Sequence, residues 1–180
     1  MLAFPGFFLS ELGEPFLKCF YSAVILDSAG VGLLVTDIDG VVSGFVVGTL
    51  HSNGFYKKII KKNWFTLIWS AMPKLLLRPR RILKIFRSLK SSANTELPNT
   101  ACLLSICVNP NVAGKGIGKV LLSAFEEQLL NCGKNYVFLT TDANNNDSVN
   151  QFYLRNDFTL RSSFEQRAGR VMNVYVKELR

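Results

Sequence analysis

The sequence predicts a mixed α/β fold in a single domain that covers residues 1–180. Its 180 residues are 48% hydrophobic and 19% charged, which supplies enough apolar material for one buried core. Runs that are typical of strands lie at 31–50 and 158–179, and a strand, a glycine-rich turn and an amphipathic helix follow one another at 101–131. A sheet flanked by helices accommodates these three features.

The first element is a predicted helix from Leu9 to about Leu26. Ser10 stands where a helix cap is favourable, just before Glu11, and apolar residues recur at helical spacing. These apolar positions are Leu9, Leu12, Phe16, Leu17, Phe20, Tyr21 and Val24. We expect this stripe to face the core.

A β-hairpin is predicted at Val31 to Ile38 and Val41 to Leu50. The dipeptide Asp39-Gly40 between the two runs is a strong short-range hairpin signal. Gly44 and Gly48 interrupt the second run, which indicates a bulge or the close approach of another element.

Residues 57–98 form a predicted helical insertion within the domain. The apolar stretch from Trp64 to Leu77 is shorter than the roughly 20 residues that a membrane span needs, so a transmembrane helix is not predicted. Two short helices that meet near Pro73 and Arg78-Pro79 are expected instead, and the second is amphipathic as far as Leu89. A polar loop at 91–100 closes the insertion.

The net charge of +8 is concentrated in this insertion. No acidic residue lies between Asp39 and Glu96, whereas the interval holds the bases Lys57, Lys58, Lys61, Lys62, Lys74, Arg78, Arg80, Arg81, Lys84, Arg87 and Lys90. Residues 57–90 are open to three interpretations: an anion-attracting wall over an acceptor site, a contact with an anionic membrane surface, or a solvated helical cover. Nucleic acid is a weaker fourth, because the aromatic residues sit apart from the bases.

The cysteines and the start of the chain bear on compartment and metal binding. Cys19, Cys102, Cys107 and Cys132 have no C-x-x-C spacing and only His51 as an imidazole, so we predict buried thiols and neither a metal site nor a disulfide framework. The apolar start has no basic residue before Lys18 and is interrupted by Pro5-Gly6, so no signal peptide is predicted. A cytoplasmic location is the expectation.

The glycine-rich turn after the strand Ala101 to Val108 is the most informative part of the sequence. Gly114, Gly116 and Gly118 lie directly before a helix, so main-chain N–H groups gather at the positive end of the helix dipole and form a phosphate cradle. A P-loop would need glycine at Ala113 and a hydroxyl at Val120, and a dinucleotide fingerprint would need glycine at Lys119. Both of these classes are disfavoured by the spacing.

The remaining elements follow the turn in a regular order. The helix is expected to continue to about Asn131 and to stop at Gly133, with Val120, Leu121, Ala124, Phe125 and Leu129 facing inward. A buried strand at 136–140, a polar turn at 142–147 and a short helix at 148–156 come next. Strands at 158–166 and 171–179, joined across Ala168-Gly169, close the chain.

Two segments resemble motifs of the GNAT superfamily of N-acetyltransferases. The turn G-K-G-I-G-K-V-L-L resembles the coenzyme A pyrophosphate loop [Q/R]-x-x-G-x-[G/A], with Gly116 and Gly118 at its small positions and Ala113 at the Gln/Arg position. The segment 146–158 resembles the family's N-x-x-[A/small]-x-x-[F/L]-Y-x-x-x-G-F pattern, which it matches at Asn146, Phe152, Tyr153 and Phe158. It departs at Val149 and at Asp157, a residue that tolerates the left-handed conformation of the usual glycine.

The resemblance implies a fold and an activity. The fold is a mixed, mostly antiparallel central sheet with a splayed parallel pair, flanked by helices, in which the family's first strand has no clear counterpart here. The activity is direct transfer of acetyl from acetyl-CoA, the cosubstrate, to an amine of a small molecule, for which an anionic or nucleotide-linked amino sugar is one option. The alternative is an accessory module of the same fold that binds acetyl-CoA without catalysis or sits at a membrane surface. A homodimer also stays open.

The resemblance also implies roles for individual residues. Main-chain groups of Ile106, Cys107 and Val108 would pair with the pantetheine arm, which Asn146 would also reach, and Tyr153 would donate to the departing thiolate. The predicted pyrophosphate loop consists of Ala113, Gly114, Lys115, Gly116, Ile117, Gly118 and Lys119. The general base is not evident: Glu96 is ranked ahead of Asp142 and His51.

Overall fold

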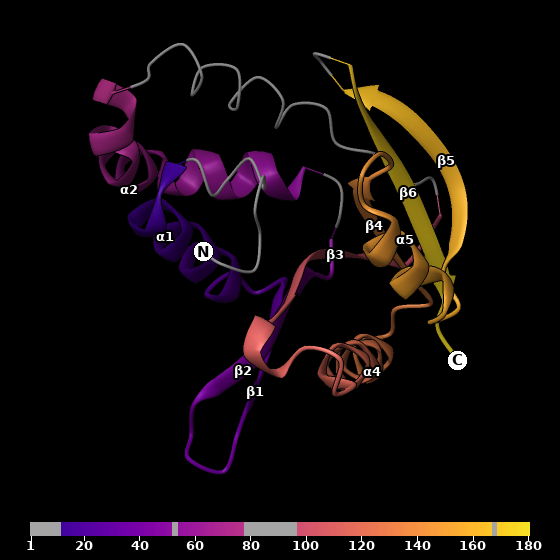
Figure 1. Ribbon diagram of the computed structural model, residues 1–180. Coiled ribbons are helices and arrows are strands. Elements are labelled where there is room, and N and C mark those ends of the chain that lie inside the picture. Colours follow the sequence, from indigo (N-terminus) through magenta and orange to yellow (C-terminus); the bar gives the residue numbers. More distant parts are fainter. Residues whose placement is uncertain (1–11, 52–53, 78–96, 167–168) are drawn as a thin grey trace.

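The computed structural model describes residues 12–51, 54–77, 97–166 and 169–180 (Figure 1). These residues form one six-stranded mixed sheet with the strand order β1-β2-β3-β4-β6-β5. In chain order the elements are α1 (Glu14–Ile25), β1 (Gly30–Thr36), β2 (Val42–Thr49), α2 (Phe55–Leu77), β3 (Thr100–Val108), the short 3-10 helix η2 (Pro110–Val112), α4 (Ile117–Asn131), β4 (Tyr136–Asp142), α5 (Asp147–Leu154), β5 (Thr159–Gln166) and β6 (Arg170–Glu178). The predicted fold class is confirmed.

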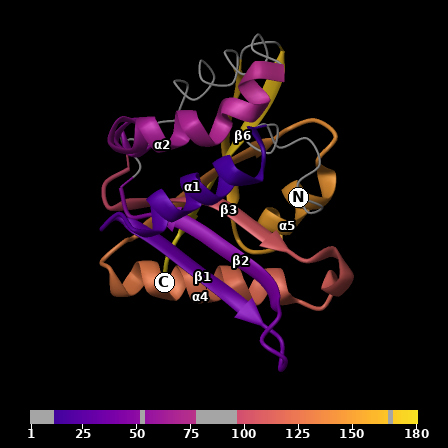
Figure 2. The same cartoon turned by 90° about the vertical axis from the view of Figure 1, so that its left-hand side faces the viewer.

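Helices cover both faces of this sheet. In Figure 1, α1 and α2 lie on one side of the strands, and α4 and α5 lie on the other. In Figure 2, which is turned by 90°, β1 and β2 run between α1 above and α4 below. Each face has its own buried apolar cluster, one around Phe125 and Leu139 beneath α4 and one around Phe16 and Ile59 between α1, α2 and the sheet.

Helix α1 begins later than the apolar pattern predicts. Its first residue is Glu14, preceded by Gly13 at φ 92°, and a proline occupies the first turn, where a missing N–H costs nothing. Phe16, Phe20 and Val24 are buried at a spacing of four residues, as expected. The predicted start at Leu9 and the predicted Ser10 cap lie outside the described residues, and no strand precedes α1 within the described part of the chain.

The predicted first hairpin is confirmed, and its glycines have packing reasons. Strands β1 and β2 are antiparallel, and Gly40 in the turn has φ 78°. A Cβ atom on Gly48 would lie 2.3 Å from the ring of Phe125, and one on Gly44 would lie 2.7 Å from the Cys107 carbonyl oxygen. Both glycines therefore let another element approach β2 closely.

The predicted helix break near Pro73 is wrong. A helical segment runs from Phe55 through Pro73 to Leu77, and its non-helical residue is Asn63. The Asn63 Nδ2 group donates a 3.0 Å hydrogen bond to the Ile59 carbonyl, so a side chain competes locally with the helical backbone pattern. The predicted second, cationic helix lies outside the described residues.

Helix α4 has the predicted bounds but a different buried stripe. Leu121, Leu122, Phe125 and Leu129 are buried, whereas Val120 is 58% exposed and Ala124 is also exposed, so their predicted inward placement is wrong. The helix packs on β1, β2 and β3, and this docking turns the buried face by about one residue relative to the prediction. Gly133 ends the helix with φ 71°, as predicted.

The C-terminal elements also follow the sequence. Strands β5 and β6 form the predicted antiparallel hairpin at one edge of the sheet. Asp157, which stands where the family pattern has glycine, takes the left-handed conformation with φ 66°.

Candidate active site

The only parallel pair in the described sheet separates soon after it begins. Strands β3 and β4 pair at Thr100 with Tyr136, Ala101 with Val137 and Cys102 with Phe138. Beyond these three pairs β3 continues against β2 alone, and β4 continues against β6 alone. The edge of β3 from Leu103 to Val108 that faces β4 therefore has no strand partner among the described residues.

A bulge in β3 lies at the start of this separation. Val47 pairs with Ser105 and Gly48 pairs with Leu103, so Leu104 is an extra residue on β3. Such a bulge bends a strand and changes which side chains face which side. Leu103 before the bulge and Ile106 after it both contact the core cluster under α4, whereas Leu104 contacts the clusters on the other face. The bulge thus aims the second half of β3 away from β4.

The glycine-rich turn follows the free end of β3. The Asn109 main-chain N–H donates to the Ser43 carbonyl, and its side-chain oxygen accepts from the Asn111 N–H, which fixes the exit from the strand. Gly114 has φ 79° and Gly116 has φ 78°, a region that side chains rarely adopt. A Cβ atom on either glycine would meet nothing within 4 Å, so the backbone conformation is what requires glycine there.

The turn presents main-chain donors at the start of α4. Gly116 is the N-cap and offers no side chain, so the N–H groups of Ile117, Gly118 and Lys119 find no acceptor in the described part of the chain. No acidic residue occupies the first turn, and the side chains of Lys115 and Lys119 are exposed. Ala113, also exposed, adds no polar group. These features suit a phosphate group bound chiefly by main-chain amides.

Gly118 joins the glycine-rich turn to the second motif. A Cβ atom on Gly118 would lie 3.3 Å from the Phe152 ring, so the absence of that atom allows the ring of α5 to pack against α4. Phe152 also contacts the core cluster beneath α4. The two segments on which the family resemblance rests are therefore neighbours in space.

Two asparagines fix the turn between β4 and α5. Asn146 Nδ2 donates to Thr141 Oγ1 at 2.8 Å and to the Asp142 carbonyl, so this amide nitrogen shapes the turn. Asn150 is 8% exposed; its Nδ2 donates to the carbonyls of Asp142 and Asn146, and its Oδ1 accepts from the Asn173 amide and the Tyr175 hydroxyl. No sequence pattern marks Asn150, because most of its partners lie on β4 and β6. The expectation that Asn146 reaches a cofactor stays a prediction.

Tyr153 is buried next to the separation of the parallel strands. It is 6% exposed and belongs to the core cluster that also contains Leu103 and Leu139, the first residues beyond the last β3–β4 pair. Its ring packs at 5.5 Å from Phe158 and 5.9 Å from Tyr175. The hydroxyl has no hydrogen-bond partner among the described residues, and burial raises the pKa of the phenol well above its ordinary value. Tyr153 is thus a protonated donor in an apolar setting.

The structure describes two of the three candidate bases, Asp142 and His51, and the general base stays unassigned. Glu96 lies outside the described residues. Asp142 is held by Arg170, whose Nη2 donates to Asp142 Oδ2 at 2.6 Å, and this pairing raises the pKa of the guanidinium. His51 is exposed just after β2, whose last residue pairs with Cys102 near the start of β3 and therefore far from the glycine-rich turn.

A polar pair that the sequence did not reveal lies on the opposite face of β3. The Tyr21 hydroxyl of α1 and the Ser105 Oγ of β3 are 2.8 Å apart, and Ser105 is 8% exposed. Burial raises the pKa of Tyr21 and also that of the half-buried Cys107 thiol. Tyr21 stood in the predicted apolar stripe, and only the contact with the bulged strand gives it a polar partner.

The cysteines are less uniform than predicted. Cys102 is buried, and burial raises the pKa of its thiol to about 12. Cys19 and Cys107 are half-buried, and Cys132 is exposed, so the prediction of four buried thiols is wrong. Among the described residues, no group of three or more His, Cys, Asp or Glu side chains could hold a metal ion.

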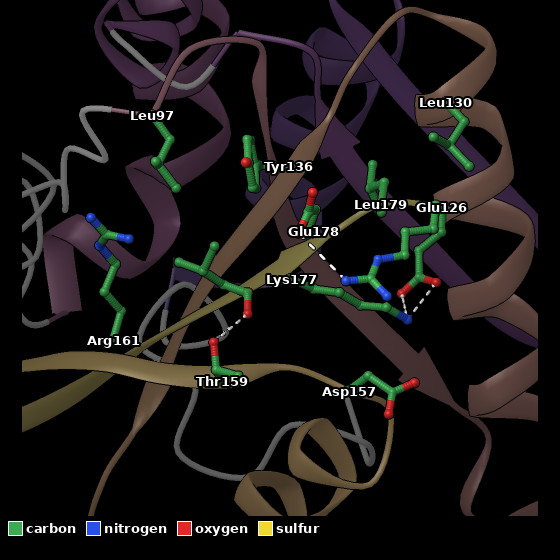
Figure 3. Close-up of a pocket in the computed structure, with 12 residues that line it drawn as sticks. Leu97, Glu126, Leu130, Tyr136, Asp157, Thr159, Arg161, Lys177, Glu178 and Leu179 are labelled. Atoms are coloured by element: carbon green, nitrogen blue, oxygen red, sulfur yellow. Dashed lines mark hydrogen bonds and ion pairs between the residues drawn. The ribbon is translucent and has the colours of Figure 1, made fainter.

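Another hollow in the structure lies away from this site. A cavity of about 800 Å³ is lined by Tyr136 at the start of β4, by Glu126 and Leu130 of α4, and by the end of β6; Figure 3 draws these side chains. Glu126 and Lys177 form an ion pair in its wall at 2.8 Å. The cavity is next to the paired end of β3 and β4, and we assign it no part in the chemistry.

Among the described helices, none combines the length and the hydropathy that a membrane span requires.

Comparisons with known proteins agree with this geometry. The model of the acetyltransferase (GNAT) family matches residues 3–158. No curated protein sequence matches the chain significantly.

Solved structures show the same fold at low sequence identity. A GNAT family protein from Desulfovibrio desulfuricans superposes with a TM-score of 0.55 at 15% identity, over 84% of this chain and 71% of that protein. The ribosomal-protein-S18-alanine N-acetyltransferase from Escherichia coli gives a TM-score of 0.53 at 13% identity, over 90% of this chain and 76% of that protein. The PaiA N-acetyltransferase from Thermoplasma acidophilum was solved in complex with coenzyme A. It gives a TM-score of 0.50 at 16% identity, over 83% of this chain and 61% of that protein. The chain belongs to the acetyltransferase (GNAT) family, with acetyl-CoA as its cosubstrate.

Proposed function

We propose that this acetyltransferase moves an acetyl group from acetyl-CoA directly to the amine of a small molecule where β3 and β4 separate. One observation carries the proposal: an unpaired strand edge leads straight into a turn whose main-chain donors have no acceptor in the described residues. An extended polar arm that ends in a pyrophosphate fits both features, because it would pair with the strand edge and place its charge at the helix N-terminus.

On the cofactor side, each feature has a candidate role. The N–H groups at Gly114 to Lys119 would hold the pyrophosphate, and Lys115 and Lys119 would add charge from the solvent side. The main-chain groups of Ile106, Cys107 and Val108 would pair with the pantetheine arm. Ala113 removes the side chain that the family pattern places in the loop, so the main-chain amides would contribute most of the affinity.

For the reaction itself, we assign Tyr153 the role of stabilising the departing thiolate. The amine attacks the thioester carbon, the carbon–sulfur bond breaks to release coenzyme A as its thiolate, and the proton that the nitrogen loses passes to water or to the unassigned base. The raised pKa of the Tyr153 phenol makes full proton transfer to sulfur more costly than for a phenol of pKa about 10. Donation of a hydrogen bond to the thiolate is therefore the favoured role.

The acceptor would approach from the face that carries α1. Tyr21 and Ser105 offer a polar contact there, on the half of β3 that the bulge turns away from β4. We further propose an acceptor with negative charge, such as a nucleotide-linked or otherwise anionic amino sugar. The support is the run of eleven bases without an acid between Asp39 and Glu96, which would raise the local concentration of anions.

A panel of amines tests both parts of the proposal. Acetyl-CoA consumption would be measured with amino sugars, nucleotide-linked amino sugars, polyamines, amino acids and peptides. We expect slow hydrolysis without an amine and stimulation by at least one anionic amino sugar, with weaker stimulation at high salt. Stimulation by polyamines alone would overturn the anionic acceptor but leave acetyl transfer standing.

A non-catalytic module is the second candidate function. It is favoured by Ala113 and by the lack of a carboxylate on β3, whose side chains toward α1 include Ser105 instead. Calorimetry separates the two: binding of coenzyme A together with no turnover of any amine in the panel would support the module and contradict catalysis. Absence of coenzyme A binding would contradict both.

A further inference from the structure

The outward side of α2 carries an exposed group of large apolar side chains. Trp64, Phe65, Ile68 and Trp69 are 58%, 59%, 42% and 62% exposed. Their spacing of one, four and five residues places them on one side of a helix. The Phe65 ring lies 5.8 Å from Trp64 and 6.0 Å from Trp69, so the aromatic rings form a continuous surface, here called the aromatic face.

An adjacent side of the same helix is already used by the core. Ile59, Leu67 and Ala71 are at most 2% exposed and belong to the cluster shared with α1. A surface helix normally presents a polar side to water once its apolar side is buried. Helix α2 instead carries exposed large apolar side chains directly beside its buried ones, and exposed apolar patches of this kind mark interaction surfaces.

Positive charge adjoins the aromatic face. Lys57, Lys61 and Lys62 are exposed on the two turns that precede it, whereas Lys58 is tied to the buried carboxylate of Asp27 at 2.8 Å. The sequence places no acidic residue between Asp39 and Glu96, so none on α2 offsets these lysines. The surface is thus both apolar and cationic.

We propose that the aromatic face and its lysines dock on an anionic lipid bilayer. Tryptophan and phenylalanine rings partition to the depth of the lipid headgroups, and lysines bind the negative surface potential of anionic lipids. The helix would lie in the interface, since no described helix meets the requirements of a span. A second copy of the chain fits the surface less well, because it would bring the lysines of two molecules together. Nucleic acid fits less well because the rings contact one another edge-on instead of standing apart to stack on bases.

The two tryptophans of the chain, Trp64 and Trp69, both lie on this surface, so selectively excited tryptophan emission reports on it alone. The full chain would be mixed with vesicles of phosphatidylcholine, with or without about one third phosphatidylglycerol, at low and high salt. We expect co-sedimentation, a blue shift of the emission and quenching by brominated lipid, only with anionic vesicles and weaker at high salt. No binding to anionic vesicles at low salt would overturn the proposal.

Paired variants separate the surface from general effects of hydrophobicity and charge. Phe65→Ser with Ile68→Ser should weaken vesicle binding at least tenfold while both tryptophan reporters remain. The control Leu34→Ser with Leu160→Ser removes apolar side chains that are 62% and 50% exposed elsewhere, and it should bind as the parent does. Equal losses in the two pairs would contradict the proposal.

Charge is tested in the same way. Lys57→Gln, Lys61→Gln and Lys62→Gln together should weaken vesicle binding at least tenfold at low salt, because each lysine near an anionic surface is attracted by its negative potential. The control Arg155→Gln, Arg161→Gln and Arg180→Gln lowers the net charge by the same three units at other exposed sites, and it should weaken vesicle binding only slightly. Tight binding to a short RNA or DNA duplex, or a dimer that Phe65→Ser dissociates, without vesicle binding, would assign the surface to those occupants instead.

Discussion

The two faces of the sheet differ in how far apart in the sequence their interacting residues lie. Beneath α4 and α5, the site consists of short motifs close together in sequence: a glycine turn, a helix N-terminus and the segment from Asn146 to Phe158. On the face of α1 and α2, the polar pair Tyr21 and Ser105 joins residues 84 positions apart, and the outer surface is a helix inserted between β2 and β3. We infer that the first face holds the chemistry common to the family and the second holds what distinguishes this chain.

The largest effect should come from Gly116→Val on the α4 face. A β-branched side chain in the left-handed region at φ 78° costs about 1–2 kcal/mol and would move the main-chain donors of the turn. We expect a loss of about 100-fold or more in coenzyme A affinity by calorimetry, since several donors would be displaced together.

Gly133→Val is the matched control for this prediction. Gly133 has φ 71° and nothing within 4 Å of an added Cβ atom, so the strain is the same, but it lies at the other end of α4. It should lower the melting temperature about as much as Gly116→Val and leave coenzyme A affinity unchanged. Equal affinities of the two variants would place the cofactor elsewhere.

Tyr153→Phe should have the next largest effect. Removal of the hydroxyl should lower kcat at least tenfold and leave the dissociation constant of coenzyme A nearly unchanged, because the ring and its packing remain. Since burial raises the pKa of this phenol, Tyr153 stays protonated and should add no basic limb to the kcat profile up to pH 10.

Tyr175→Phe is the comparison for Tyr153. It removes a buried hydroxyl that donates to Asn150 at 2.9 Å, so we expect it to lower stability more than turnover. A normal kcat for Tyr153→Phe would withdraw its role in the reaction.

A smaller effect is expected on the α1 face. Tyr21→Phe and Ser105→Ala each remove one hydroxyl that the acceptor would contact; one hydrogen bond is worth about 0.5–1.5 kcal/mol, so the KM of the acceptor should rise roughly 3-fold to 10-fold. Coenzyme A affinity should not change. If these variants lower the affinity for coenzyme A instead, the assignment of the acceptor to the α1 face and of coenzyme A to the α4 face is wrong.

The smallest effect should be on the anchoring of α2. The pKa of Asp27 is lowered most by its hydrogen bond from Lys58 and next by the hydrogen bond from the Ala29 main-chain N–H. A lowered pKa stabilises the fold above the ordinary carboxyl pKa, and that contribution is lost as the pH falls below about 4. Asp27→Asn should therefore lower the melting temperature by a few degrees at pH 7, with the difference shrinking toward pH 3; a constant difference would contradict the pairing.

The sequence predicts the α4 face well because its signals are local. Positive φ angles at Gly133 and Asp157, the hairpins and the bounds of α4 all follow from turn chemistry and apolar spacing. The other face depends on tertiary contacts that periodicity does not contain. The bulge at Leu104 is visible only in the pairing of β3 with β2. The helix break was predicted near Pro73 but lies at Asn63, whose side chain donates a hydrogen bond to the backbone.

The buried stripe of α4 illustrates the same limit. Val120 and Ala124 fit a helical pattern as well as Leu122 does, and only the docking of α4 on β1 to β3 decides which of them face the core. Asn150 was missed for a similar reason, because its amide is satisfied by groups on β4 and β6.

Hydrogen exchange with and without saturating coenzyme A would locate the cofactor on the α4 face of the sheet. We expect slower exchange of the main-chain amides at 103–119 and no change at α1 or around Gly133. Unchanged exchange at 114–119, or protection confined to the α1 and α2 face, would contradict this location.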